Sequence, residues 1–324
     1  EIFVKKVCPG KPGQIYEIDL RNRRFFHMTI GLFFQYLVNG ISLGSLYALI
    51  AIGYTMVYGI VRLINFAHGD IIMLAAYFVF FGVGMFSLPW WLAAIISIGL
   101  TVIVGVLIEK AAYKPLREAP RISVLISAIG VSFFLENMGL VLFGGRAKSF
   151  YTPAIFKGII NVAGVSITNL VIIIPIITAI LLVATVYIVN HTTTGMAMRA
   201  CSKDMDTARL MGIDVDKIIS FTFGIGSGLA AVGGIMWALK YPQIHPLIGI
   251  MPGLKCFIAA VVGGIGNIPG AMLGGFLLGL GEILLVGFLP GLSGYRDAFA
   301  FIILILILLF RPTGILGEKV AEKV

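Results

Sequence analysis

Ionisable side chains stand inside or beside strongly apolar stretches of the sequence. His68 and Asp70 lie two residues apart in VRLINFAHGDIIML, a pairing that suggests proton relay or acid–base catalysis. No nucleophile, metal-ligand spacing or second histidine accompanies them, so an enzymatic site is not indicated. We therefore expect no enzyme and no metal or cofactor in this chain, and treat these residues as candidates for a transport function.

Residues that could line a solute pathway or gate are polar side chains or breaks within apolar runs. The candidates are Asn65, His68, Asp70, Glu136, Asn137, Gly264, Asn267 and Glu282. Asn65 and His68 are three apart and would share a helix face. Asp70 would lie near the start of the next helix at the cytoplasmic membrane edge, where its charge suits the helix dipole.

Three of these candidates lie deep inside apolar runs. Glu136 and Asn137 lie in ISVLISAIGVSFFLENMGLVLF, and Glu282 lies in GLGEILLVG. Such residues are expected to point into a helix bundle or a cavity, where Glu282 could meet the ammonium group of a zwitterionic solute. A structural hydrogen bond to another helix explains them equally well.

Composition places all of these residues in a membrane protein. The chain has 324 residues, of which 59% are hydrophobic and 12% are charged, and its mean hydropathy is +1.03. Apolar runs of the roughly 20 residues that a spanning helix requires recur along the sequence. The predicted spans are 34–58, 64–86, 90–109, 122–143, 169–190, 218–239 and 296–310.

The stretch 254–289 is less regular than the other apolar runs. It is too long for one untilted span, and Gly264 and Asn267 lie where glycine, proline and asparagine interrupt it. Two short helices could meet at mid-membrane, a re-entrant segment could precede a full span, or a glycine-rich helix could simply cross another. We predict an all-α polytopic membrane protein, a bundle of about eight transmembrane helices with a broken or re-entrant segment near 254–289.

Lysine and arginine set the orientation. They cluster in the loops 110–121 and 199–217, which the positive-inside rule places in the cytoplasm. The loops 144–168 and 241–253 are then external, and the side of the C-terminus stays open. The net charge is +9, but the basic residues do not form a basic face with interleaved aromatic residues, so nucleic acid is not an expected partner.

The chain divides into three parts. Residues 28–317 are the predicted transmembrane permease domain, between a polar extension, 1–27, that is disordered or not native, and a short tail, 318–324. No polar interval is long enough for an ATPase domain, and no phosphate-binding loop is found. Any nucleotide energy must come from a partner; a stand-alone channel or an ion-driven secondary transporter is the alternative class.

The segment 195–212, GMAMRACSKDMDTARLMG, is a charged island between two apolar runs. Asp204 and Asp206 could begin a break between two short helices, and Gly212 could end the second one. Such an amphipathic segment could lie on the membrane surface, or dock into a groove of a soluble subunit and move as a rigid lever.

A resemblance favours docking. The segments 39–70, 126–137, 195–234, 259–275 and 308–317 closely resemble the branched-chain amino acid ABC transporter permeases of the LivH type. The resemblance implies a prokaryotic inner-membrane protein that pairs with a LivM-like permease, two ATP-binding subunits and an external substrate-binding protein. It implies leucine, isoleucine or valine as solute, although urea and short-chain amide permeases look similar over the same motifs. The implied ATPase-coupling residues, to which we add Arg209, are Gly195, Ala197, Arg199, Ala200, Ala208, Gly212 and Ile213.

Overall fold

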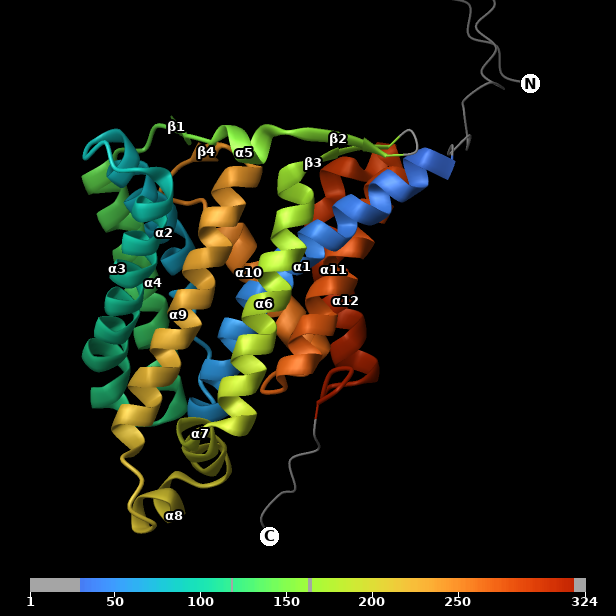
Figure 1. The fold of residues 1–324 in the computed structure, drawn as a ribbon. Helices are drawn as coiled ribbons and strands as arrows, with labels where there is room; N and C mark the ends of the chain where they lie inside the picture. The colour runs from blue at the N-terminus through green and yellow to red at the C-terminus, as the bar shows by residue number, and fades with distance from the viewer. Residues whose placement is uncertain (1–29, 118, 163–164, 318–324) are drawn as a thin grey trace, which may run out of the picture.

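The computed structural model describes residues 30–117, 119–162 and 165–317, which form an almost entirely helical bundle (Figure 1). Within these residues, seven helices are long and apolar enough to cross a membrane. The prediction of an all-α polytopic membrane protein is therefore confirmed. The predicted extension 1–27 and tail 318–324 lie outside the described residues.

The elements follow one another as a chain of long helices with short connections. The helices are α1 (Ile30–Val61), α2 (His68–Gly84), α3 (Trp90–Ile108), α4 (Arg121–Phe143), α5 (Ala154–Lys157), α6 (Asn169–His191), α7 (Thr193–Lys203), α8 (Met205–Leu210), α9 (Val215–Lys240), α10 (Ile250–Gly263), α11 (Ile268–Phe288) and α12 (Arg296–Phe310). A π-helical turn, η2 (Glu109–Tyr113), extends α3, and two 3₁₀ turns are η3 (Lys114–Leu116) and η4 (Pro290–Tyr295). The strands are β1 (Lys148–Ser149), β2 (Ile159–Val162), β3 (Val165–Thr168) and β4 (Gln243–Ile244).

The two ends of the bundle differ in character. All four short strands gather at one end, and α7 and α8 project from the other (Figure 1). β1 pairs antiparallel with β4, and β2 with β3. The loops 144–168 and 241–253, both predicted to be external, are therefore joined at the end opposite α7 and α8. α12 runs back toward the α7–α8 end, which settles the side on which its last residue, Phe310, lies.

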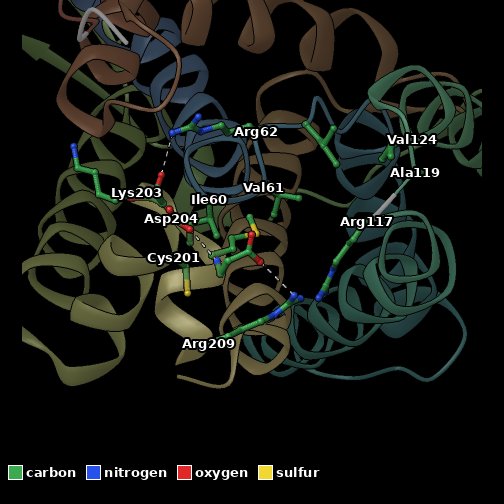
Figure 2. A pocket seen from close by; sticks show the side chains of 14 residues that line it. Ile60, Val61, Arg62, Arg117, Ala119, Val124, Cys201, Lys203, Asp204 and Arg209 are labelled. Carbon is green, nitrogen blue, oxygen red and sulfur yellow. Dashed lines mark hydrogen bonds and ion pairs between the residues drawn. The ribbon is translucent and has the colours of Figure 1, made fainter. Parts of the chain in front are cut away.

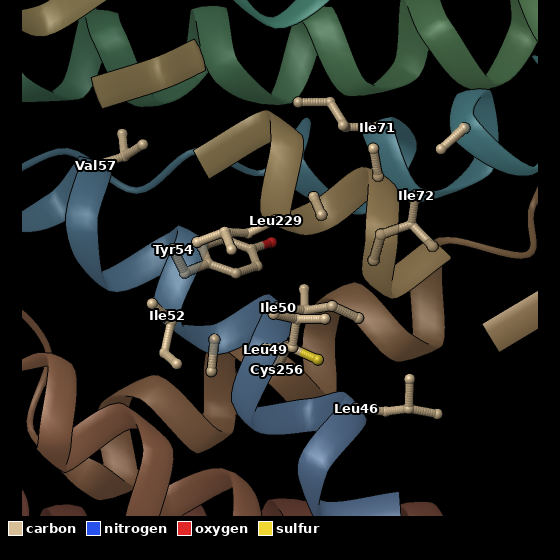
Figure 3. Close-up of a cluster of buried hydrophobic side chains, with 14 of the residues drawn as sticks. Leu46, Leu49, Ile50, Ile52, Tyr54, Val57, Ile71, Ile72, Leu229 and Cys256 are labelled. Atoms are coloured by element: carbon tan, nitrogen blue, oxygen red, sulfur yellow. The ribbon is translucent and has the colours of Figure 1, made fainter. Parts of the chain in front are cut away.

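Helix α1 forms the centre of the bundle. In its most apolar window, 94% of the residues are buried inside the protein, because α11, α9, α10 and α6 all pack against it. Leu46, Leu49 and Ile50 on α1 meet side chains from α2, α9 and α10 in one continuous core (Figure 3). A helix that is apolar on every side is enclosed by other helices or surrounded by lipid, and for α1 the enclosure comes from other helices.

Glycines allow α1 and α11 to approach closely. A Cβ added at Gly279 would collide with the backbone of Gly44, and one added at Gly275 would collide with the backbone of Ala48. Small residues at such positions let two helix backbones come together within a membrane, where packing rather than water drives association. The glycines of these two helices thus serve tight helix packing.

Two of the apolar helices, α2 and α10, are shorter than the seven candidate spans, and only the first of them was unexpected. The run 64–86 was expected to span the membrane, but residues 62–67 are not helical, and α2 is 17 residues long. The run 254–289 is divided, as expected: α10 has 14 residues, and the full-length α11 follows it. Their junction, Gly264–Asn267, lies toward the α7–α8 end (Figure 1), so the arrangement is a short helix before a full span.

Candidate functional site

The connection from α6 to α7 is a sharp reversal. The Thr192 hydroxyl accepts a hydrogen bond from the Gly195 backbone N–H at 3.0 Å and so caps α7. A Cβ at Gly195 would collide with the backbone carbonyl of Ile188 in α6. Only glycine therefore permits α7 to turn back so closely on the helix before it.

The predicted break inside the charged island is confirmed. One Asp204 carboxylate oxygen accepts from the backbone N–H groups of Asp206 and Thr207, at 3.0 and 3.1 Å, and caps α8. Gly212 has φ +81°, the left-handed conformation that favours glycine, so it ends the segment as expected. Asp214 then caps α9, and the Lys217 side chain and backbone N–H lower the pKa of this carboxyl below its ordinary value.

The predicted coupling residues divide into a packed set and an exposed set. Gly195 and Ala208 are buried, Ala197, Ala200 and Ile213 are half-buried, and Arg199, Arg209 and Gly212 are exposed. The Arg199 guanidinium donates to the Val189 carbonyl of α6, which holds α7 against its own chain. Arg209 lies 3.7 Å from Asp206, at a spacing of three residues on an exposed helix.

Large apolar side chains face solvent on the outermost turn of this segment. Leu210 is 87% exposed and Met211 is 78% exposed, on a segment that projects from the bundle. Both directly precede Gly212, so they belong to the most protruding part of the charged island. An exposed apolar pair rimmed by charges is typical of a surface that a partner protein covers.

A cavity of about 530 Å³ lies between this segment and the membrane helices (Figure 2). Arg62, Arg117 and Arg209 line it from three different parts of the chain, with Asp204 and Cys201 from the α7–α8 turn. The Arg62 guanidinium donates to the Ser202 carbonyl at 3.3 Å. The end of α1 therefore contacts the α7–α8 segment directly.

An ion network behind the cavity joins α3 to α9. Glu109, fully buried at the start of η2, accepts hydrogen bonds from Ser220 Oγ at 2.6 Å and from Arg117. Arg117 also pairs with Asp216, and Lys114 Nζ lies 2.8 Å from the same carboxylate. Two cations and two carboxylates thus link α9, the helix that follows α8, to the end of α3 and the turns after it.

The candidates between α1 and α2 are buried rather than placed at an exposed membrane edge. Asn65 is not helical, so it does not share a helix face with His68; its side chain accepts a hydrogen bond from the Tyr113 hydroxyl at 2.8 Å. The His68 ring packs 4.3 Å from the Tyr54 ring, centroid to centroid. Asp70 lies in the first turn of α2, as predicted, but it is only 2% exposed.

The start of α2 meets the start of α10 inside the protein. A Cβ at Gly69 would lie 2.8 Å from the Gly249 carbonyl oxygen, and one at Gly253 would lie 2.7 Å from the Gly69 Cα. The two helices run from this contact toward opposite ends of the bundle (Figure 1). Two positive helix ends therefore converge there, with the carboxylate of Asp70 on the first turn of α2.

The remaining candidates lie apart from one another. Ser132 on α4 donates to Asp70 at 2.6 Å, and Glu136, four residues further along α4, lies on the same face of that helix. Glu136 is half-buried and Asn137 is exposed on α4, so Asn137 does not point into the bundle of this chain. The reason is that α4 packs on one side only, and its apolar character reflects a lipid-like or partner environment.

Gly264 and Asn267 form the turn between α10 and α11. Gly264 has φ +110°, and the Asn267 side chain accepts from the Gly270 N–H at 3.0 Å and donates to the Leu316 carbonyl at 2.9 Å. These contacts account for both residues as a turn and a helix cap. Their role in a pathway stays a prediction.

Glu282 is the most heavily partnered of the candidates. Its carboxylate accepts hydrogen bonds from Lys255 Nζ at 2.9 Å and from the Tyr47 hydroxyl at 2.8 Å, and Arg296 Nε lies 3.3 Å away. Lys255 also pairs with Asp297 at 2.6 Å. The sequence predicted a carboxylate in the bundle interior; the structure adds the cations that balance it.

Comparison with known proteins identifies the family. Residues 36–308 match the family described as "Branched-chain amino acid transport system / permease component". The chain belongs to this permease family. It is 43% identical over 305 residues to the high-affinity branched-chain amino acid transport system permease protein LivH of Escherichia coli, with 90% of this chain and 98% of that protein covered.

Two other relatives support the same assignment. The permease protein BraD of Pseudomonas aeruginosa is 44% identical, with 90% of this chain and 98% of BraD covered. A LivH protein of Methanocaldococcus jannaschii, named as a probable branched-chain amino acid permease, is 28% identical, with 87% and 91% covered. Members of the family are transport permeases, and this chain is a multi-pass protein of the prokaryotic inner membrane.

Sequence reasoning missed several residues of this permease that the structure makes prominent. Glu109, Asp216 and Ser220 were not singled out, and neither were Lys255 and Asp297. Glu109 ends an apolar run, and Lys255 interrupts another, so an ionisable residue at the edge of a span was the available signal. In the described residues no group of three or more His, Cys, Asp or Glu could hold a metal ion; the absence of a cofactor stays a prediction.

Proposed function

We propose that this chain is a transmembrane permease subunit of an ATP-driven importer that carries branched-chain amino acids into the cytoplasm. The identity of 43–44% to LivH and BraD over nearly their whole length carries the proposal. Those relatives are named as permeases of high-affinity branched-chain amino acid transport systems. The same solutes, leucine, isoleucine and valine, are the natural expectation here.

The proposed importer has further subunits. A second, LivM-like permease pairs with this chain in the membrane, an external binding protein delivers the solute, and two ATP-binding subunits dock on the cytoplasmic face. The α7–α8 segment is the proposed docking element. Its exposed Leu210 and Met211, with Arg209 beside them, offer an apolar contact with a charged rim, as expected of a partner-binding surface.

The structure suggests how motion at α7–α8 would reach the membrane helices. When ATP binding draws the two ATPase subunits together, a docked α7–α8 segment moves with them as a short lever. Two contacts oblige the membrane helices to follow: Gly195 against α6, and Arg62 on the Ser202 carbonyl. The network of Glu109, Arg117 and Asp216 then links α9, the helix that follows α8, to the end of α3. Alternating access then follows from rigid-body movement of helices around the enclosed α1.

Gene deletion tests the solute. Energised uptake of labelled leucine, with labelled urea beside it, is measured in the deletion strain and in the complemented strain. We expect loss of leucine uptake alone, restored by complementation. Loss of urea uptake alone would reassign the solute to the urea and amide class, and no loss of either would refute the proposed import function.

Co-purification tests the class of transporter. A channel or an ion-driven transporter needs no ATPase, whereas the proposed importer must associate with one. We expect the tagged chain, extracted gently from its own membranes, to retain ATP-binding subunits, and its leucine uptake to stop when ATP is depleted at constant membrane potential. Uptake that follows the potential and ignores ATP would support the alternative class.

A further inference from the structure

A second cavity opens at the end of the bundle opposite α7 and α8. It has a volume of about 320 Å³ and extends from the exposed loop at Ser293 and Gly294 to Tyr47 in the middle of α1. Its volume falls at the lower end of the range of about 300–1,000 Å³ that is usual for small-molecule sites. The cavity is thus large enough for an amino acid and open toward the external side.

The lining combines both signs of charge with aromatic surface. The cations are Lys255 and Arg296, and the carboxylates are Glu282 and Asp297. Trp237 stacks on Tyr47 with the ring centroids 6.1 Å apart, and both rings line the same cavity. Charged groups of both signs beside aromatic side chains match the chemistry of an amino acid with an apolar side chain.

Two cations, Lys255 and Arg296, meet two carboxylates, Glu282 and Asp297, in this cavity. Lys240 does not line the cavity and donates to the Ser42 hydroxyl at 3.2 Å. The buried Arg296 Nε makes no hydrogen bond within the described residues, although it lies 3.3 Å from Glu282. The cluster has capacity for one more anionic oxygen.

We propose that this cavity binds a zwitterionic α-amino acid on its way from the external side. The inference rests on the proposed function and names its solute site. The solute carboxylate pairs with Arg296, whose side chain is 36% exposed, and the solute ammonium pairs with Asp297, whose side chain is 50% exposed. Trp237 and Tyr47 contact the apolar side chain.

Exchange of ion pairs explains why the site would select a zwitterion. Lys255 is 8% exposed and Glu282 is 2% exposed, so this pair holds the floor of the cavity while Arg296 and Asp297 at its mouth exchange partners. A solute with a single charge would satisfy one of these mouth residues and leave the other unpaired, which is unfavourable in a partly desolvated site. A neutral solute such as urea would compensate neither.

The test uses cysteine protection at the mouth of the cavity. Ser293→Cys is introduced into the full importer in a Cys8→Ser, Cys201→Ser background, where the remaining Cys256 is fully buried. Right-side-out vesicles, washed free of external binding protein, are labelled with a membrane-impermeant thiol reagent. Ser149→Cys, exposed on β1 at the same end, is the matched control.

We expect leucine to slow labelling of Ser293→Cys and to leave Ser149→Cys unchanged. At ten times its dissociation constant, leucine leaves about one site in eleven free, so labelling slows about tenfold. Leucinamide, 4-methylpentanoate and urea, which each lack at least one of the two charges, should not protect at the same concentration. Arg296→Gln, added to Ser293→Cys, should abolish the protection by leucine.

Three results would overturn the inference. Absence of protection by leucine, in vesicles that take up leucine once the binding protein is added back, would remove the site and leave the proposed function intact. Equal protection by 4-methylpentanoate would show a general anion site, and protection by urea would show no selection for charge. Failure of leucine uptake in the intact importer, by contrast, would count against the proposed function itself.

Discussion

Ser220 donates a hydrogen bond to Glu109 at 2.6 Å, which ties the end of α3 to the second turn of α9. Glu109 is fully buried, and its other partner, Arg117, also pairs with Asp216. Since α9 is the helix that follows α8, this bond joins the helix next to the proposed docking element to a neighbouring membrane helix. The two helices cannot separate at this end without exposing a buried carboxylate.

Neutralising Glu109 tests this link. Glu109→Gln keeps the shape of the side chain but leaves Arg117 and Lys114 facing only Asp216. We expect the free energy of unfolding to fall by about 1.5–3 kcal/mol, the usual value for a hydrogen bond to a charged group, measured by thermal unfolding of the purified protein. The control is Lys217→Gln, which removes a pair whose side chains are 83% and 50% exposed and should leave the unfolding temperature nearly unchanged, because solvent screens such a pair. Equal losses would contradict the structural role.

Reversing the charge of Arg209 tests docking. Arg209→Glu alters a half-exposed side chain that lies 3.7 Å from the exposed Asp206, so the fold should be retained. We expect leucine uptake to fall about tenfold, the effect of about 1.4 kcal/mol on association, with the protein still inserted in the membrane. Arg146→Glu, an equal reversal on an exposed loop at the other end, should leave uptake unchanged. Normal uptake and ATPase association in Arg209→Glu would refute the docking surface.

A methyl group at Gly279 tests the close approach of α1 and α11. Gly279→Ala would press its Cβ on the Gly44 backbone, which neither helix can relieve by a rotamer change. We expect a loss of about 1–3 kcal/mol, as for other overpacked interiors. At Gly99 on α3 a Cβ meets no described atom within 4 Å, so Gly99→Ala should be neutral or gain about 0.5–1 kcal/mol. If the two variants had the same unfolding temperature, α1 and α11 would be farther apart than these contacts indicate.

Removing Lys255 alone, and then together with Glu282, separates the effect on stability from the effect on transport. Lys255→Met leaves the buried Glu282 without its 2.9 Å partner, and loss of one member of a buried pair costs about 3–5 kcal/mol. Lys255→Met with Glu282→Leu removes both charges and should recover most of that stability. We expect leucine uptake to stay low in the double variant, because the floor of the proposed site is lost. Recovered uptake would mean that the pair is structural only.

The sequence was a good guide where local rules decide the structure. The break at Asp204 and the end at Gly212 were predictable, because helix caps and left-handed glycines act within a few residues. The pairing of Glu109 with Ser220 crosses 111 residues, and that of Lys255 with Glu282 crosses 27, so neither can be derived from spacing alone. The non-helical segment 62–67 was missed because enclosure by protein lets an apolar stretch leave the helical conformation inside a membrane.

The enclosure of α1 has a consequence for the assembly of the protein during its synthesis. During synthesis α1 enters the bilayer long before α9 and α11, the two helices that contribute much of its packing surface. Until they arrive, its polar side chains Ser42, Ser45 and Thr55, all buried in the finished fold, face lipid or the insertion machinery. Assembly of the native core must therefore await the late helices, and any chain that stops before α11 leaves its own centre uncovered.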